Sequence, residues 1–531
     1  MKQRVSDFIA DFLVDNDIKQ VFTVVGGGAM YLNDSFGNHK DLKCIYNHHE
    51  QASAIAAESY ARIENKMAVT CVTTGPGGTN ALTGVLCAYQ DNIPMLVISG
   101  QVRYKTTIES TGLNLRQFGE QEYNILNSVK NMTKYACMIK DPKDIKYYLQ
   151  KAIYIANNGR KGPVWLDIPL DIQGDNIDIN NLREYRQSKS KTDNSENIFK
   201  ILEAIKCSKK PVILAGSAIR MSGARKEFLE LIEKMEIPIL TPLGVADLIE
   251  NGHKLYFGNF GVLGGRAGNF IVQNSDLIIS MGCRMSFKQV GFNYEKFAPD
   301  AKKIVIDIDN EELQKETINI DIAINANIYD IIYELNRTTK VIKFNNKKWI
   351  NYCNLLKNRF TIYKEEFKIS DKVNHYYFLN KFNRMIPKNS ITVLGNSGAN
   401  SASLQMGVMH RDQRLFANVN CGTMGYDLPA AIGAYMAAQK EIFCLTGDGS
   451  IQMNIQELQT IRHNNLPIKI IIFNNQGYQS ILNTQNNFFE RRHNGANFSS
   501  GISMPNFEKI ANAYSIPYKL IKTHKDIDLF L

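Results

Sequence analysis

Short apolar runs alternate with amphipathic stretches along most of the 531 residues. Val5–Asp15 has the three- and four-residue apolar spacing of a helix, whereas Gln20–Val25 and Met95–Ser99 are apolar runs with the length of buried strands. A strand is also predicted near the end of the sequence, at Tyr518–Ile521. Strands that alternate with helices in this way predict parallel sheets covered by helices. The pattern therefore predicts an α/β protein built from three doubly wound parallel-sheet domains.

The same pattern predicts where these domains begin and end. We expect an N-terminal domain at residues 1–178, a central domain at 195–335 and a C-terminal domain at 370–531. Arg183–Asn197 is polar, charged and poor in apolar residues, which predicts a linker. Residues 337–372 are charged and predict a mixture of helix and linker.

Composition narrows the class of protein. No run of about 18 apolar residues is present, so no transmembrane helix is predicted. The formal charge of +10 is spread along the chain, which favours a solvated surface over a nucleic-acid groove or a membrane contact. Nine scattered cysteines without a CxxC pair support neither a zinc site nor a disulfide framework, so we expect a cytoplasmic location.

One stretch combines glycine, carboxylate and amide residues at the ends of two predicted strands. The sequence GDGS at 447–450 follows the apolar run Glu441–Thr446, a helical pattern covers Ile451–His463, and the strand Ile468–Phe473 ends at two asparagines. Ligands of open α/β sheets bind at such carboxyl ends. Oxygen ligands suit Mg²⁺, and glycines allow phosphate to approach the backbone. A lone GDG is more often a plain tight turn, but the pair at this spacing indicates a diphosphate site.

This pair of motifs resembles the thiamine diphosphate enzymes, which carry GDG at the head of such a segment and NN at its end. The resemblance implies that Asp448 and the side chain of Asn475 bind Mg²⁺, with the backbone carbonyl of Gly477 as a third ligand. It also implies a cofactor-binding segment that includes Gly447, Gly449, Ser450, Asn475 and Tyr478.

Glu50 stands between a short predicted strand, Lys43–Tyr46, and the alanine-rich helix Gln51–Arg62. The resemblance implies that its carboxyl group contacts the pyrimidine ring of the cofactor and promotes loss of the thiazolium proton. An isolated glutamate at a helix start would more often only match the helix dipole. His48 and His49 are interpreted as structural residues.

Several loops complete the predicted site. By the same resemblance, the GTMG loop bends the cofactor, with Met424 between its two rings and the Gly422 carbonyl accepting a hydrogen bond from the amino-pyrimidine. Gln117 and Gln121 are candidates for contact with the substrate. The alternative is that they belong to a polar loop without a ligand. The cofactor-binding loop residues are Gly26, Gly27, Gly75, Pro76, Asn80, Gly422 and Met424.

The middle domain of some relatives binds FAD, and the resemblance makes FAD one of two alternatives here. The segments that match are Gly216, Gly261, Gly264, Gly282–Arg284 and Asp307–Asp309. The stretch Met285–Lys288 departs from the acidic and basic residues usual after this point in acetohydroxyacid synthases. The other alternative is a structural domain without flavin.

The resemblance is closest to the acetolactate synthase-like group. It implies decarboxylation of a 2-oxo acid such as pyruvate, carboligation to a second carbonyl, and a homodimer or homotetramer with Glu50 and Asp448 of one site on different chains. Leu170 and Thr484 stand where acetohydroxyacid synthases carry lysine and tryptophan, so a ligase for a sugar-linked ketone is an alternative. The family pattern also continues beyond Leu531, so a further alternative is a truncated, inactive subunit that binds the cofactor. An NAD-dependent dehydrogenase is disfavoured, because no GxGxxG opens a suitable helix.

Overall fold

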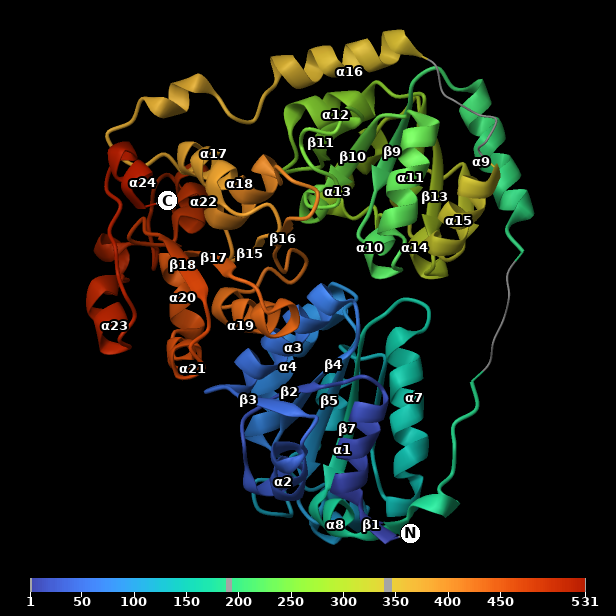
Figure 1. Ribbon diagram of the computed structural model, residues 1–531, viewed down its shortest axis with the longest axis vertical. Coiled ribbons are helices and arrows are strands. Elements are labelled where there is room, and N and C mark those ends of the chain that lie inside the picture. Colours follow the sequence, from blue (N-terminus) through green and yellow to red (C-terminus); the bar gives the residue numbers. More distant parts are fainter. Residues whose placement is uncertain (1, 188–192, 339–345, 531) are drawn as a thin grey trace. The chain divides into compact units, whose positions relative to one another are not determined.

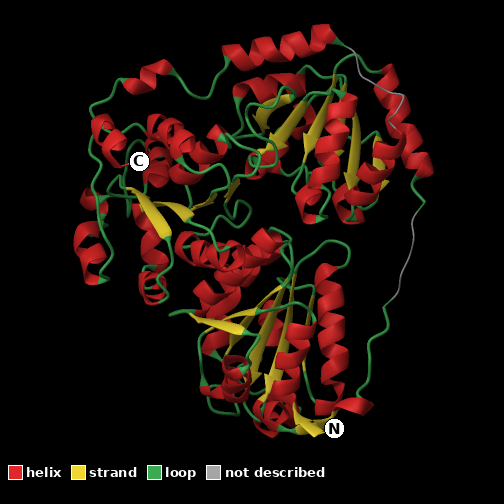
Figure 2. Ribbon diagram, viewed as in Figure 1, coloured by secondary structure: helices red, strands yellow, loops and turns green. Residues whose placement is uncertain are grey.

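The computed structural model describes residues 2–187, 193–338 and 346–530 (Figure 1). The chain forms two compact units, one made of residues 1–189 and 418–517 and the other of residues 190–417 and 518–531. Each unit contains parallel strands flanked by helices (Figure 2). Part of the predicted linker, 188–192, and part of the second charged segment, 339–345, lie outside the described residues.

The N-terminal part of the first unit is built on one parallel sheet of six strands in the order β3-β2-β4-β5-β7-β6. Every residue of the neighbouring strands β5 and β7 is buried, and both strands are mostly apolar in sequence. The elements are β1 (Lys2–Arg4), α1 (Val5–Asp15), β2 (Gln20–Thr23), α2 (Met30–Asn38), β3 (Lys43–Tyr46), α3 (Glu50–Glu64), β4 (Ala68–Val72), α4 (Pro76–Gln90), β5 (Met95–Gln101), α5 (Ile108–Thr111), α6 (Ile125–Val129), β6 (Tyr135–Met138), α7 (Ile145–Asn157), β7 (Pro163–Pro169), α8 (Leu170–Gly174) and β8 (Asn176–Asp178).

The second part of this unit contains the strands that carry the GDGS and NN motifs. Strands β17 and β18 pair in parallel, with Gly447 opposite Phe473. Helix α19 packs closely on α3, since a Cβ atom at Gly433 would lie 2.0 Å from the carbonyl oxygen of Ala56. The elements are α19 (Asp427–Ala438), β17 (Ile442–Gly447), α20 (Asp448–Ile451), α21 (Glu457–His463), β18 (Ile468–Phe473), α22 (Gln479–Phe488) and α23 (Phe507–Ala513).

The other unit is built on a second parallel sheet of six strands, in the order β11-β10-β9-β12-β13-β14. A further parallel pairing, between β15 and β16, follows later in the chain. The elements are α9 (Ser195–Cys207), β9 (Pro211–Ala215), α10 (Ala218–Met221), α11 (Arg225–Met235), β10 (Ile239–Pro242), β11 (Tyr256–Phe260), α12 (Arg266–Gln273), β12 (Leu277–Met281), α13 (Phe287–Val290), β13 (Lys302–Asp307), α14 (Asn310–Gln314), β14 (Ile322–Asn325), α15 (Ile328–Thr338), α16 (Lys347–Arg359), α17 (His375–Met385), β15 (Ile391–Leu394), α18 (Gly398–Met406), β16 (Arg414–Phe416) and α24 (His524–Phe530).

The predicted parallel α/β class is confirmed, with three local corrections. The helix predicted at Ile451–His463 is interrupted: α20 ends at Ile451, a 3₁₀ turn follows, and α21 begins at Glu457. The GPGG sequence belongs to α4 from Pro76 onward, because proline suits the first turn of a helix. The predicted strand Tyr518–Ile521 is not a strand in the structure.

Candidate functional site

Asp448 lies at the carboxyl end of β17 and is held by backbone N–H groups. Its Oδ2 accepts hydrogen bonds from the backbone nitrogens of Asn475 and Gly477, each at 3.1 Å, and its Oδ1 accepts one from Gly449 at 2.9 Å. Because β17 and β18 are neighbours, the two motifs predicted from sequence meet at one edge. The segment that follows β18 is therefore folded around the Asp448 carboxylate.

The electrostatics of Asp448 fit a bound cation. The residue is 2% exposed, and burial raises the pKa of its carboxyl group, while the backbone N–H donors partly offset this. Among the described residues, no lysine, arginine or histidine pairs with it, so the buried charge has no countercharge from the protein. A carboxylate beside amide and carbonyl oxygens is the donor set that Mg²⁺ prefers. Asn475 is exposed, and no cluster of three or more His, Cys, Asp or Glu side chains occurs within the described chain.

The turn after Asp448 is connected to the predicted GTMG loop. Ser450 Oγ donates to Asp427 Oδ2 at 2.5 Å and accepts from the backbone nitrogen of Gly425 at 3.0 Å. Asn454 Nδ2 donates to the carbonyl oxygen of Gly425 at 2.7 Å. These bonds fix the end of the loop that carries Gly422 and Met424, and Met424 itself is half-buried. Ser450 is thus a structural link between the two cofactor segments.

Tyr478 closes the diphosphate turn from the other side. Its ring lies against Gly449, where an added Cβ would be 2.2 Å from the nearest ring carbon. Only glycine fits at this position with the ring in place. Tyr478 N donates to the carbonyl oxygen of Ala496 at 2.8 Å, which fastens the segment to the following loop.

Glu50 is the first residue of α3 and is 9% exposed. The helix is capped by His49, whose Nδ1 accepts from the backbone nitrogen of Gln51 at 3.1 Å, so His49 has a structural role in the described contacts. Asn80 Nδ2 donates to Glu50 Oε2 at 3.0 Å, and Glu50 Oε1 is 3.6 Å from an ideal Cβ position on Gly77. The first turn of α4 and the first turn of α3 therefore enclose the predicted acid.

The remaining N-terminal loops pack on the same region. A Cβ at Gly26 would lie 2.5 Å from Cβ of Thr73, and Gly28 N donates to Thr73 Oγ1 at 3.1 Å. Gly75 has a φ of 60°, and a Cβ there would lie 2.2 Å from the carbonyl oxygen of Gln121. The structure thus brings Gln121 beside the Gly75 turn, whereas Gln117 is exposed and has no such contact described.

Glu457 was not singled out from the sequence, yet it joins the two motif regions. The residue is fully buried at the start of α21. Its Oε2 accepts from Asn47 Nδ2 and its Oε1 from the backbone nitrogen of His48, each at 2.9 Å. Its position after the GDGS motif offered no signal, because an acidic residue at a helix start is common. Among the described hydrogen bonds, none joins Glu50 directly to Asp448 or Met424.

The predicted flavin segments of the other unit are tightly packed. A Cβ at Gly216 would lie 1.9 Å from the carbonyl oxygen of Gly282, so the ends of β9 and β12 touch through backbone. Arg284 Nε pairs with Glu312 Oε1 at 2.9 Å. Phe287 and Phe292, which follow β12, are exposed and stacked, with ring centroids 5.9 Å apart.

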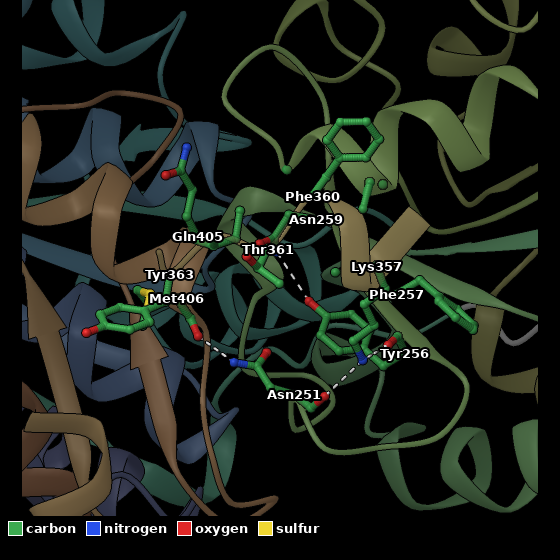
Figure 3. Close-up of a pocket in the computed structure, with 15 residues that line it drawn as sticks. Asn251, Tyr256, Phe257, Asn259, Lys357, Phe360, Thr361, Tyr363, Gln405 and Met406 are labelled. Atoms are coloured by element: carbon green, nitrogen blue, oxygen red, sulfur yellow. Dashed lines mark hydrogen bonds between the residues drawn. The ribbon is translucent and has the colours of Figure 1, made fainter. Parts of the chain in front are cut away.

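A separate cavity of about 230 Å³ lies in this unit (Figure 3). Lys357 Nζ donates at its wall to the carbonyl oxygens of Tyr256 at 2.6 Å and Asn251 at 3.2 Å. Phe257, Phe360 and other apolar groups supply much of its lining. None of the residues predicted for the thiamine cofactor lines it.

Comparison with known protein families defines the class of protein to which this chain belongs. Three family models match along the chain: the N-terminal TPP binding domain of thiamine pyrophosphate enzymes at residues 3–122, their central domain at 198–335, and their C-terminal TPP binding domain at 395–529. Together with the Asp448 turn, these matches define a thiamine pyrophosphate enzyme.

Individual relatives narrow this class. A probable acetolactate synthase large subunit of Methanococcus aeolicus is 32% identical, over 96% of this chain and 86% of the relative. Acetolactate synthase large subunits of Cyanidium caldarium and Lactococcus lactis subsp. lactis (strain IL1403) are each 31% identical, over 98% of this chain and 89% of the relative. The chain belongs to the acetolactate synthase large subunit family of thiamine pyrophosphate enzymes. The predicted family and enzyme class are therefore confirmed.

Proposed function

We propose that this chain uses thiamine diphosphate and Mg²⁺ to decarboxylate a 2-oxo acid, with pyruvate as the first candidate, and to join the resulting unit to a second carbonyl. The observation that carries the proposal is the buried Asp448 carboxylate, held by the backbone of Asn475 and Gly477 without a cationic partner among the described residues. The acetolactate synthase names of the relatives support the choice of pyruvate.

The residues divide the work between binding and proton transfer. Asp448, the Asn475 side chain and the Gly477 carbonyl would hold Mg²⁺ and through it the diphosphate. When bound, thiamine diphosphate supplies the nucleophilic carbon and the electron sink for decarboxylation. Glu50, oriented by Asn80, would hold the proton shared with the pyrimidine ring. Met424 would shape the bound cofactor, and Gln121 would face the substrate.

Assembly and location form part of the same proposal. In the family arrangement the acid of one subunit serves the diphosphate turn of another, so we propose a homodimer or homotetramer with sites at subunit interfaces. A cytoplasmic location is supported by the nine cysteines, for which no disulfide is described. Among the described residues, no helix combines the length and apolar character needed to cross a membrane.

FAD is proposed as an alternative to a flavin-free central domain. The exposed, stacked rings of Phe287 and Phe292, which follow β12 in the chain, support a flat ligand. The pairing of Arg284 with Glu312 supports the flavin-free alternative, because that guanidinium group already has a partner. The absorbance spectrum of the purified protein between about 350 and 500 nm decides between them, because a bound flavin absorbs there and the protein does not.

The proposed reaction is tested with purified protein and pyruvate, with and without thiamine diphosphate and Mg²⁺. We expect release of CO₂ that requires both, and products identified by mass spectrometry with a panel of aldehydes, ketones and sugar-linked ketones. A product only with the last class would assign the sugar ligase alternative, which Leu170 and Thr484 favour. Cofactor binding without CO₂ release would instead identify an inactive subunit.

A further inference from the structure

Gln101, the last residue of β5, has a side chain whose hydrogen-bonding positions are all used. It is 1% exposed. Its Nε2 donates to Asp167 Oδ2 at 3.1 Å and to the carbonyl oxygen of Tyr123 at 3.0 Å. Its Oε1 accepts from Thr74 Oγ1 at 2.5 Å and from the backbone nitrogen of Val102 at 3.0 Å. If the amide were flipped, Nε2 would face the N–H donor of Val102, and Oε1 would face the carbonyl oxygen of Tyr123. The hydrogen bonds therefore fix one orientation of the Gln101 side chain.

Asp167 holds this amide from the interior of the sheet. The residue lies in β7, next to β5, and is fully buried. Ser99 Oγ donates to its Oδ1 at 2.5 Å, and Trp165 Nε1 donates to Ser99 Oγ at 2.8 Å. The carboxyl group is therefore oriented on both oxygens, and Gln101 receives that orientation through Nε2.

The two outer partners of Gln101 belong to the two loops that the proposed reaction uses. Thr74 directly precedes the Gly75 turn, and the helix that follows carries Asn80, which bonds to Glu50. Tyr123 comes two residues after Gln121, whose carbonyl oxygen packs against Gly75. One buried amide thus joins the loop beside the predicted acid to the loop beside the predicted substrate.

We propose that Gln101 is a positioning residue, which sets the Thr74–Asn80 turn and the Gln117–Tyr123 segment at a fixed separation, so that Glu50 on the cofactor and Gln121 on the substrate serve the same site. The inference rests on the proposed function, since that function gives Glu50 and Gln121 their roles. Gln101 itself is buried and acts through its neighbours.

The test compares Gln101→Leu with Gln20→Leu. Gln20 is a matched control because it is also a buried glutamine of this sheet, and its Nε2 donates to one backbone carbonyl, that of Lys43, at 2.8 Å. We expect Gln101→Leu to speed amide hydrogen exchange in residues 74–80 and 104–123 and to raise the KM for pyruvate about tenfold, because a small misplacement of binding groups weakens productive binding. Gln20→Leu is expected to leave both unchanged.

Two variants of Thr74 separate positioning from general stability. Thr74→Val removes the hydroxyl that donates to Gln101, whereas Thr74→Ser keeps it. We expect Thr74→Val to raise the KM in the same direction as Gln101→Leu, and Thr74→Ser to restore the wild-type value.

The outcomes distinguish a failure of the proposed function from a failure of the positioning role of Gln101. If the wild-type protein neither binds thiamine diphosphate with Mg²⁺ in a calorimeter nor consumes pyruvate, the proposed function is overturned and the positioning role is overturned with it. If the wild-type protein is active but Gln101→Leu matches Gln20→Leu in exchange and in KM, the positioning role alone is overturned.

Discussion

The carboxylate of Glu457 lies 2.9 Å from Nδ2 of Asn47, although 410 positions separate the two residues in the sequence. The same carboxylate accepts from the backbone nitrogen of His48, and Asn47 Oδ1 in turn accepts from Ser53 Oγ of α3. The helix that follows the diphosphate turn therefore holds the segment that leads into Glu50, within a single chain.

Replacing Glu457 with alanine should destabilise the first unit and disturb Glu50. The change leaves the buried side-chain amide of Asn47 and the partly buried backbone N–H of His48 without this acceptor, which costs about 1–3 kcal/mol. We expect a lower Tm and a reduced kcat. Gln459→Ala, an exposed position on the same helix, is the control and should behave as wild type. An unaltered Tm in Glu457→Ala would contradict the role assigned to this contact.

The contrast between Asp448 and Glu457 explains what the sequence could and could not predict. Asp448 was predicted because glycines flank it and an asparagine pair ends the next strand, and neighbouring parallel strands must bring those motifs to one edge. The partners of Glu457 and Gln101 could not be predicted, because each bond joins segments whose proximity depends on tertiary packing. The strand expected at Tyr518–Ile521 failed because an apolar run specifies a strand only where a sheet edge accepts it.

Glu50→Gln should separate binding from turnover. Glutamine keeps an oxygen that can accept from Asn80 Nδ2, so the local structure is preserved. It cannot take up or release a proton as a carboxyl group does, and general acid–base catalysis contributes roughly 10²–10⁴-fold. We expect thiamine diphosphate affinity within a few-fold of wild type by calorimetry, with CO₂ release reduced by about that factor. Turnover equal to wild type would remove Glu50 from the mechanism.

Mixing two inactive variants tests whether sites form between subunits. Asp448→Ala should lose Mg²⁺-dependent cofactor retention, and Glu50→Gln should lose turnover, so neither homodimer is active. In a mixed dimer with sites shared between chains, one site keeps both residues, and random mixing restores about a quarter of wild-type activity. Refolding the two variants together and assaying CO₂ release measures this, with each variant refolded alone as the control. Absence of recovery in verified mixed dimers would place both residues of a site on one chain.

Gly75→Ala should be far more damaging than Gly27→Ala. An alanine at Gly75 would adopt a φ of 60° and place its Cβ 2.2 Å from the carbonyl oxygen of Gln121, a backbone atom that cannot move without shifting its loop. No atom lies within 4 Å of the Cβ position at Gly27. We expect Gly75→Ala to lower the Tm by several degrees and Gly27→Ala to leave it unchanged. Equal Tm values for the two variants would contradict the close packing of Gly75 on Gln121.

The buried carboxyl of Asp167 should make stability depend on pH. Burial raises the pKa of Asp167 from 3.8 to about 7, against the lowering effect of the Ser99 and Gln101 hydrogen bonds. Between these two values the folded protein binds more protons than the unfolded chain, so this group's contribution to stability falls as the pH rises from about 4 to about 7. Asp167→Asn cannot titrate, and its amide can still bond to both neighbours.

We therefore expect the Tm of Asp167→Asn to rise relative to the Tm of wild type as the pH is raised from about 4 to about 7, and the difference to become constant above that range. Gln459→Ala, an exposed substitution that replaces no titrating group, is the control and should keep a constant difference throughout. Scanning calorimetry of the three proteins at several pH values provides the measurement. If the Tm difference between Asp167→Asn and wild type did not change with pH, Asp167 would take up no proton in this range. A contact other than those with Ser99 and Gln101 would then have to stabilise its buried charge.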